Sequence, residues 1–115
     1  MEQTFDVDVD VTKGVPVVSV QGEIDVATAP MLRERLHHTI AESGPNVVVD
    51  LLGVTFLDST ALGVLIGALK QCREKEGNLL LAIDEPRILK VFEITRLSDV
   101  FAISSTLEGA LQAAR

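Results

Sequence analysis

Hydrophobic and polar residues alternate strictly near the start of the chain. From Phe5 to Val11 every second residue is apolar and aspartates lie between them, so one face of a strand is buried and the other meets water. Lys13-Gly14 supplies a turn, and the β-branched residues at 15–21 predict a returning strand. The start of the chain therefore predicts an antiparallel hairpin.

The period then becomes helical. Thr28 is expected to cap a helix whose first turn accommodates Pro30, and Ser-Gly-Pro at 43–45 ends it. Gly63 and Gly67 lie four residues apart in a later helix and predict close packing of that helix on the sheet. The other predicted elements are buried strands at 47–52 and 79–83, a helix from Ser59 to about Glu76 that Gly77-Asn78 stops, a helix from Pro86, an edge strand at 100–103 and a terminal helix around 107–111.

Strands that alternate with helices need crossover connections, which favour parallel pairing. The predicted fold class is α/β, with a mixed sheet that opens on the antiparallel hairpin and continues with mostly parallel strands. About four helices pack on it, in the order ββαβαβαβα. The 115 residues suit one domain spanning 1–115.

Charge and composition narrow the function. The net charge is −7, and residues 1–25 hold six carboxylates against one lysine, which disfavours a nucleic-acid partner. The longest apolar stretch, Ala61 to Leu69, is too short to cross a bilayer. With no signal peptide apparent and one cysteine, Cys72, we expect a cytoplasmic protein without membrane contact.

The usual catalytic motifs are missing from the sequence. No Gly-rich phosphate loop is present, and the adjacent His37 and His38 point in different directions on a helix, so we expect no metal and no cofactor. Ser59 lies at a strand-to-helix turn, but its flanks lack the glycines of a hydrolase nucleophile elbow. Cys72 is predicted on a buried helix face. The sequence therefore favours a protein that is not an enzyme.

One segment stands out, Asp58-Ser59-Thr60, after a buried strand. Asp58 is expected to cap the following helix by accepting the unpaired N–H groups of its first turn. This structural role alone is enough to explain an aspartate at position 58. Ser59 and Thr60 are then two phosphoacceptor hydroxyls beside a carboxylate, at the positive end of the helix dipole.

These residues complete a resemblance that covers nearly the whole chain. The sequence resembles STAS domains, and in particular the stand-alone bacterial anti-sigma factor antagonists. Three stretches carry the resemblance, in the family's order and at its intervals: Gly22-Glu23-Ile24-Asp25 with Thr28-Ala29-Pro30, then Val47-Val48-Val49-Asp50-Leu51, then Phe56-Leu57-Asp58-Ser59-Thr60.

The resemblance implies a partner-switching phosphoprotein in transcription regulation and stress response. Ser59 matches the serine that an anti-sigma factor with protein-kinase activity phosphorylates, and resemblance favours it over Thr60. The unmodified form would bind that anti-sigma factor and free the sigma factor; phosphorylation would abolish binding, and a serine phosphatase would reset it. Asp25 matches an acidic residue beside the phosphosite, and Asp25, Asp58 and Thr60 are the expected partner contacts. We expect a monomer or weak dimer.

Two departures from the family pattern are visible. Ala61 follows the Ser-Thr pair where glycine is common, and Arg96 replaces the glycine of a Leu-Thr-Gly-Leu pattern, with consequences for a helix end or the partner surface. Other uses of the same fold stay open: a module of a lipid-transport ATPase, a stressosome-type scaffold or a nucleotide sensor, or a small phosphate-handling enzyme. A receiver domain is disfavoured because no acidic pair follows the first strand.

Overall fold

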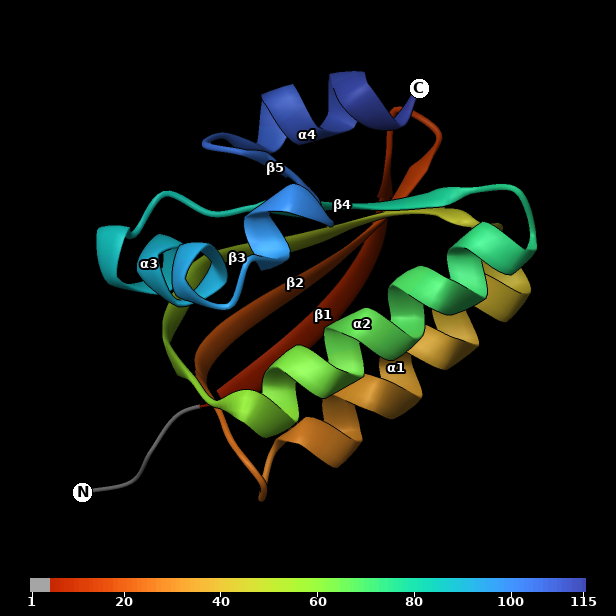
Figure 1. Ribbon diagram of the computed structural model, residues 1–115. Helices are drawn as coiled ribbons and strands as arrows, with labels where there is room; N and C mark the ends of the chain where they lie inside the picture. Colours follow the sequence, from red (N-terminus) through yellow and green to blue (C-terminus); the bar gives the residue numbers. More distant parts are fainter. Residues whose placement is uncertain (1–4) are drawn as a thin grey trace.

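The computed structural model describes residues 5–115, in which a five-stranded sheet is flanked by helices on both faces (Figure 1). The strands lie side by side in chain order; β1 and β2 are antiparallel and the other neighbours are parallel. The predicted fold class and element order are confirmed. The elements are β1 (Phe5–Thr12), β2 (Val15–Ile24), α1 (Ala29–Ser43), β3 (Asn46–Leu57), α2 (Ser59–Glu74), β4 (Asn78–Ala82), α3 (Pro86–Ile94), the 3-10 helix η1 (Leu97–Asp99), β5 (Ala102–Ser104) and α4 (Leu107–Ala114).

The opening hairpin forms as the alternation predicts. Thr12 pairs with Val15 across a two-residue turn, and both turn residues have positive φ, 54° at Lys13 and 82° at Gly14. A turn with two left-handed residues matches the twist of the flanking strands, and glycine adopts that conformation without steric cost. The hairpin therefore fixes the register of β1 on β2.

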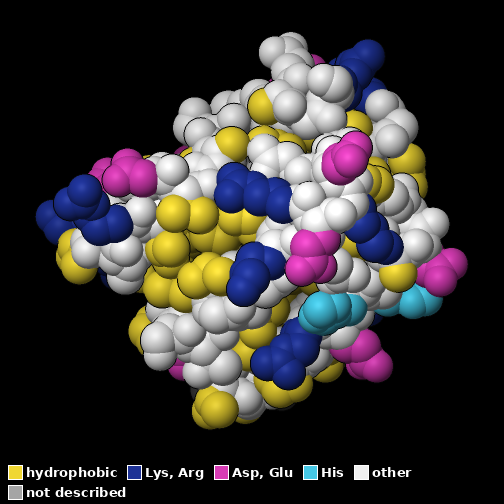
Figure 2. Space-filling view, turned by 45° about the vertical axis from the view of Figure 1, so that its right-hand side comes forward, with side chains coloured by type: hydrophobic (Ala, Val, Ile, Leu, Met, Phe, Trp, Pro, Cys, Tyr) yellow, Lys and Arg dark blue, Asp and Glu magenta, His cyan; other side chains and the backbone are white. Residues whose placement is uncertain are grey.

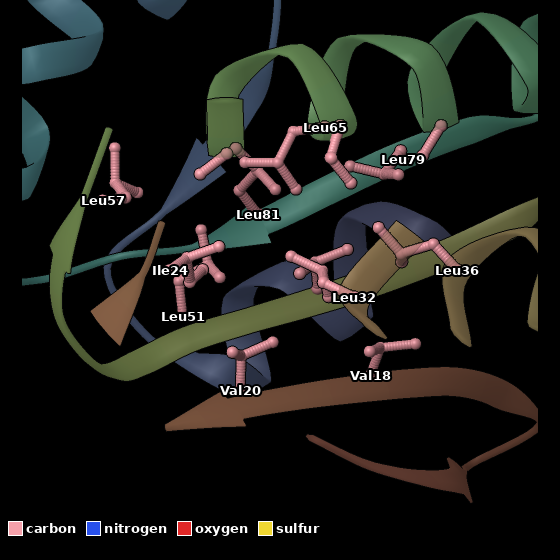
Figure 3. Close-up of a cluster of buried hydrophobic side chains, with 14 of the residues drawn as sticks. Val18, Val20, Ile24, Leu32, Leu36, Leu51, Leu57, Leu65, Leu79 and Leu81 are labelled. Carbon is pink, nitrogen blue, oxygen red and sulfur yellow. The ribbon is translucent and has the colours of Figure 1, made fainter. Parts of the chain in front are cut away.

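The main core lies between the sheet and helices α1, α2 and α3. Side chains from β2, β3 and β4 meet the apolar stripes of the helices in one cluster, part of which is drawn in Figure 3. A smaller cluster on the opposite face joins Ala110 and Leu111 of α4 to Val17, Val48 and Leu80. Residues of β3 alternate between the two clusters because successive strand side chains point to opposite faces. Both faces of the central strand are thus covered.

The C-terminal end of α2 differs from the sequence expectation, whereas the helix begins at Ser59 as predicted. The helix stops at Glu74, two residues early, and the left-handed position is taken by Glu76 with φ 64°. Gly77 serves a different purpose, because a Cβ there would collide with the carbonyl oxygen of Pro45. Gly63 and Gly67 do not mediate packing on the sheet; both are exposed, and nothing lies within 4 Å of where their Cβ atoms would be. The prediction of close packing at these two glycines is wrong.

The two strands that lead into the Asp58 region are longer than their apolar stretches suggest. β2 continues to Ile24, and β3 continues five residues past Leu52 to Leu57. The pairing of β2 with β3 shifts register between Ser19 and Gln21 and again between Gly22 and Glu23. Each shift places an extra residue in β3, and such bulges bend a strand and redirect its side chains. The bent end of β3 carries Asp58 to the end of the sheet where α2 begins (Figure 1).

Candidate functional site

The predicted site residues converge at one end of the sheet, where β2 and β3 end and α1 and α2 begin. Ile24 is paired with Leu57, and the backbone N–H of Asp58 donates to the carbonyl of Ile24 at 3.2 Å. Asp25 and Asp58 therefore follow paired residues on neighbouring parallel strands. The structure brings together the two segments that the sequence singled out, although they are 33 positions apart in the chain.

Asp58 caps α2 as predicted. Its backbone is extended, with φ −116° and ψ −172°, and its carboxylate Oδ1 accepts the N–H of Ala61 at 3.1 Å. Its carbonyl accepts the N–H of Leu62 at 3.1 Å, which begins the helical hydrogen-bond ladder. This cap fixes the first turn of the helix, so the next two side chains have defined positions.

Ser59 and Thr60 occupy the first two positions of α2. Ser59 is exposed and Thr60 is partly buried, and neither hydroxyl makes a hydrogen bond within the described chain. The backbone N–H groups of a helix's first turn carry the positive end of its dipole. The Ser59 hydroxyl is thus both accessible and close to a region that favours negative charge.

Asp25 shapes the turn between β2 and α1. Its Oδ1 accepts the N–H of Ala27 at 2.9 Å and that of Thr28 at 3.2 Å. Thr28 does not supply the expected side-chain cap; its hydroxyl donates back to the carbonyl of Glu23 at 2.9 Å and accepts the N–H of Asp25 at 2.9 Å. The backbone of Thr28 is helical, with φ −102° and ψ −20°, and not extended as in a side-chain cap, so the N–H of Met31 donates to the carbonyl of Thr28 at 3.1 Å instead.

Exposed hydrophobic side chains surround this end of the sheet, and sequence reasoning did not identify them. Val26 is 73% exposed, Met31 in the first turn of α1 is 51% exposed, and Phe56 beside the end of β3 is 49% exposed. Helices α1 and α2 lie side by side, with their first turns at the same end (Figure 1). The available signal was the position of Val26 and Phe56, each within three residues of a predicted site carboxylate. Exposed apolar groups around a polar centre are typical of a protein-binding surface.

Asp25 and Asp58 carry negative charge that no ion pair within residues 5–115 compensates. The ion pairs found within residues 5–115 are Lys13–Glu108, Arg87–Glu85 and Arg96–Asp99, and none includes Asp25 or Asp58. Both carboxylates are partly buried and are held by backbone N–H groups instead. Their positions beside Ser59 are consequently fixed by the fold and not by a mobile counter-ion.

The histidines and the cysteine lie away from this end of the sheet, the histidines on the surface and the cysteine in the core. His37 and His38 are exposed on α1, and both histidine side chains lie at the surface in Figure 2. Cys72 is fully buried, and desolvation raises the pKa of its thiol to about 11 against a smaller lowering by Lys75. No group of three potential metal ligands occurs in the described part of the chain. Of the helices described, none is long and apolar enough to traverse a bilayer.

Arg96 takes the position that glycine favours after a helix. It follows the C-cap Thr95 of α3 with a left-handed φ of 66°, and its N–H donates to the carbonyl of Glu93 at 3.1 Å. The side chain pairs with Asp99 at 3.5 Å, and both groups are largely exposed. The departure from the family pattern therefore affects a helix end, as the sequence predicted. Its effect on a partner surface stays a prediction.

Comparison with known proteins agrees with this geometry. The STAS domain family profile matches residues 6–110. The anti-sigma-B factor antagonist of Bacillus subtilis (strain 168) is 39% identical over 108 residues, covering 94% of this chain and 98% of that protein. The crystal structure of an anti-sigma factor antagonist from Mycobacterium paratuberculosis superimposes with a TM-score of 0.90 at 33% identity, covering 97% of this chain and 95% of that one.

The chain belongs to the STAS domain family. The anti-sigma factor antagonist SpoIIAA shares the fold in both of its solved states. Its unphosphorylated and phosphorylated forms each match with a TM-score of 0.72, at 21% and 22% identity, over 97% of this chain and 98% and 100% of those chains.

Proposed function

We propose that this chain is an anti-sigma factor antagonist whose binding is switched by phosphorylation of Ser59. The unmodified protein binds an anti-sigma factor that is also a protein kinase and so frees the sigma factor. Phosphate on Ser59 abolishes this binding, and a serine phosphatase restores it. The chain acts in the bacterial cytoplasm as a binding protein and not as an enzyme. The antagonists from Bacillus subtilis and Mycobacterium paratuberculosis support the assignment by their names and coverage.

The observation that carries the proposal is the exposed Ser59 hydroxyl among exposed apolar groups. Val26, Met31 and Phe56 offer a partner the apolar area that a stable interface needs at its centre. Ser59 lies at the same end of the sheet and is exposed, and its hydroxyl makes no hydrogen bond to residues 5–115, so a kinase can reach it. A covalent change at this hydroxyl therefore alters the surface without breaking a hydrogen bond within the described part of the chain.

Charge explains how a phosphate would reverse binding. Phosphoserine adds about −1.5 to −2 charges at neutral pH. The helix N-terminus favours that charge by about 0.3–1 kcal/mol, so the fold tolerates it. Asp25 and Asp58 oppose it, and a partner that excludes water strengthens the repulsion: two unit charges ~6 Å apart repel by about 0.7 kcal/mol in water and by about 3 kcal/mol at an effective dielectric near 20, before salt screening. A partner surface matched to a neutral hydroxyl would additionally have to desolvate a dianion.

These magnitudes suffice for a local switch. A hundredfold loss of affinity needs about 2.7 kcal/mol. The effect of the phosphate is expected at the interface, by charge and shape, with the sheet and helices unchanged. The SpoIIAA structures support this expectation, since that protein has the same fold as this chain in its phosphorylated form as well as in its unphosphorylated form.

Ser59 is the proposed acceptor in preference to Thr60 because it is the more exposed of the two. Thr60 is expected to contact the partner together with Asp25 and Asp58. A Thr60→Val variant removes the second hydroxyl at nearly constant volume, and Ser59→Ala removes the first. Site-localised mass spectrometry after incubation with the kinase should find phosphate on Thr60→Val and none on Ser59→Ala.

The experiment that tests the function uses Ser59→Ala and Ser59→Asp as baits in a lysate of the native host, with captured proteins identified. A small kinase-type anti-sigma factor that binds the alanine bait and is lost with aspartate supports the proposal. A lipid-transport ATPase or stressosome-type scaffold that binds both baits equally would leave the family assignment intact and refute the sigma-factor role. Ser43→Ala and Ser43→Asp change an exposed serine at the C-terminal end of α1 in the same two ways; they are the matched controls and should behave like wild type.

A further inference from the structure

The alternating aspartates of β1 take no part in the proposed Ser59 switch, yet they line one edge of the sheet. β1 pairs with β2 on one side, and within residues 5–115 no strand pairs with its other side. Asp6, Asp8 and Asp10 are all exposed. An open edge of eight residues is a template on which another strand can pair.

The hairpin determines which backbone groups face this open edge. Thr12 and Val15 close a two-residue turn and so exchange backbone hydrogen bonds, whereas the next pair, Val11 with Pro16, does not. Proline, which has no N–H, fits that second position. Because the two kinds of pair alternate, the N–H and C=O groups of the odd-numbered residues 7–11 point away from β2.

The same edge offers apolar surface to a second strand. Val11 is 59% exposed, and Val9 and Phe5 are only partly buried against the core. Pairing β1 with β1 of another copy would satisfy the outward backbone groups and bury these side chains. The free edge would therefore attract a second copy if nothing opposed it.

The aspartates oppose such pairing by their register. Two copies related by a two-fold axis pair antiparallel, and residues directly opposite each other share a face. Residues 6, 8 and 10 are all aspartate. Every register whose two-fold axis passes through residue 7, 8 or 9 therefore places at least one aspartate directly opposite an aspartate of the other copy. These positions would form the non-hydrogen-bonded pairs, whose Cα atoms are about 4.5 Å apart, and like charges there are destabilising.

Among the ion pairs of residues 5–115, none includes these three carboxylates. The residues of β2 that lie opposite them are uncharged: Gln21, Ser19 and Val17. Asp10 also accepts the N–H of Val11 through Oδ1 at 2.8 Å, which occupies one of the outward donors. The carboxylates thus act on the edge both by charge and by covering a backbone group.

We propose that Asp6, Asp8 and Asp10 keep the free edge of β1 from pairing with a second copy of this chain. This role is independent of the Ser59 switch, and its failure would leave that switch untouched.

The test compares wild type with the triple variant Asp6→Asn, Asp8→Asn, Asp10→Asn by sedimentation velocity over a range of concentrations. Wild type should sediment as one chain of 12.4 kDa, and the variant should move toward twice that mass, with a dimer dissociation constant at least tenfold lower. A control with the same change of charge on α1 and α2 should behave like wild type. That control replaces the exposed Glu34, Glu42 and Glu74 by glutamine.

A second change shows whether association uses this edge. Val11→Pro in the triple variant removes an outward N–H and should return the protein to a single chain. Circular dichroism confirms that each variant is folded, and Asp8→Asn alone should shift the equilibrium in the same direction if the triple variant does not fold. A folded triple or single variant that stays monomeric would overturn the proposal, as would association that Val11→Pro does not reverse.

Discussion

The carboxylate of Asp58 accepts the backbone N–H of Ala61 at 3.1 Å, and this bond spans the Ser59-Thr60 pair. One residue thus begins the helix and fixes the direction of the two hydroxyls between the bonded groups. Asp58 is also a negative charge beside the proposed phosphosite. Its structural and electrostatic roles can be separated by substitution.

Asp58→Ala should lower the free energy of unfolding by about 0.5–2 kcal/mol, because the cap of α2 is lost. Asp58→Asn should keep most of that stability, since the amide oxygen accepts the same bond. Urea unfolding followed by circular dichroism measures both. Equal losses in the two variants would show that the charge of Asp58, and not its cap, stabilises the helix.

Gly67 within α2 and Gly77 just after it should respond to alanine in opposite directions. Gly77→Ala should destabilise the protein by about 1–3 kcal/mol, because the new methyl group collides with the backbone of Pro45. Gly67→Ala should stabilise it by about 0.5–1 kcal/mol, because the site is open and alanine is the better helix former. Thermal unfolding of the two variants in parallel measures both effects. A lower stability of Gly67→Ala than of wild type would contradict the finding that Gly67 faces open space on α2.

The left-handed backbone at Arg96 predicts a stabilising substitution. Arg96→Gly should raise the free energy of unfolding by about 0.5–1 kcal/mol, since glycine adopts φ 66° without steric cost. The exposed ion pair with Asp99 that is lost contributes little. Arg96→Ala is the control: it loses the same ion pair but keeps a Cβ, so no stabilisation is expected in urea titrations.

Burial of Cys72 predicts a loss of stability in alkali. Its thiol pKa is raised from 9.0 to about 11 by desolvation. Below pH 9 the thiol is protonated in both states; between 9 and 11 the unfolded chain loses the proton first, so stability falls as pH rises. Urea unfolding at pH 8 and pH 10.5 should show a smaller decrease for Cys72→Ala than for wild type. Equal decreases would assign the alkaline loss to other groups.

Much of the fold follows from periodicity. The alternation from Phe5 to Val11 and the helical stripes that follow it predict the hairpin, the order of elements and the cap at Asp58. The end of β3 could not be predicted in this way, because its two bulges insert residues and break the period of two. Those bulges also turn Phe56 outward, so the exposed apolar side chains beside Asp25 and Asp58 could be identified only from the structure.

Competition between neighbouring groups accounts for other differences. Thr28 is a good capping residue, but its hydroxyl donates to the carbonyl of Glu23 and its backbone is helical and not extended, so its side chain makes no cap of α1. The four-residue spacing of Gly63 and Gly67 is compatible with either face of a helix, and tertiary packing selects the exposed one. The role of Ser59 came from resemblance to the family, and the structure adds its exposure and surroundings.

The central claim is that phosphate on Ser59 abolishes binding to a kinase-type anti-sigma factor. The most direct measurement is calorimetric titration of that factor, once captured with the Ser59→Ala bait, with unmodified protein and with protein carrying phosphoserine at position 59. The account predicts an affinity at least a hundredfold lower for the phosphorylated protein, with unchanged circular dichroism. Equal affinities for the two forms would contradict it.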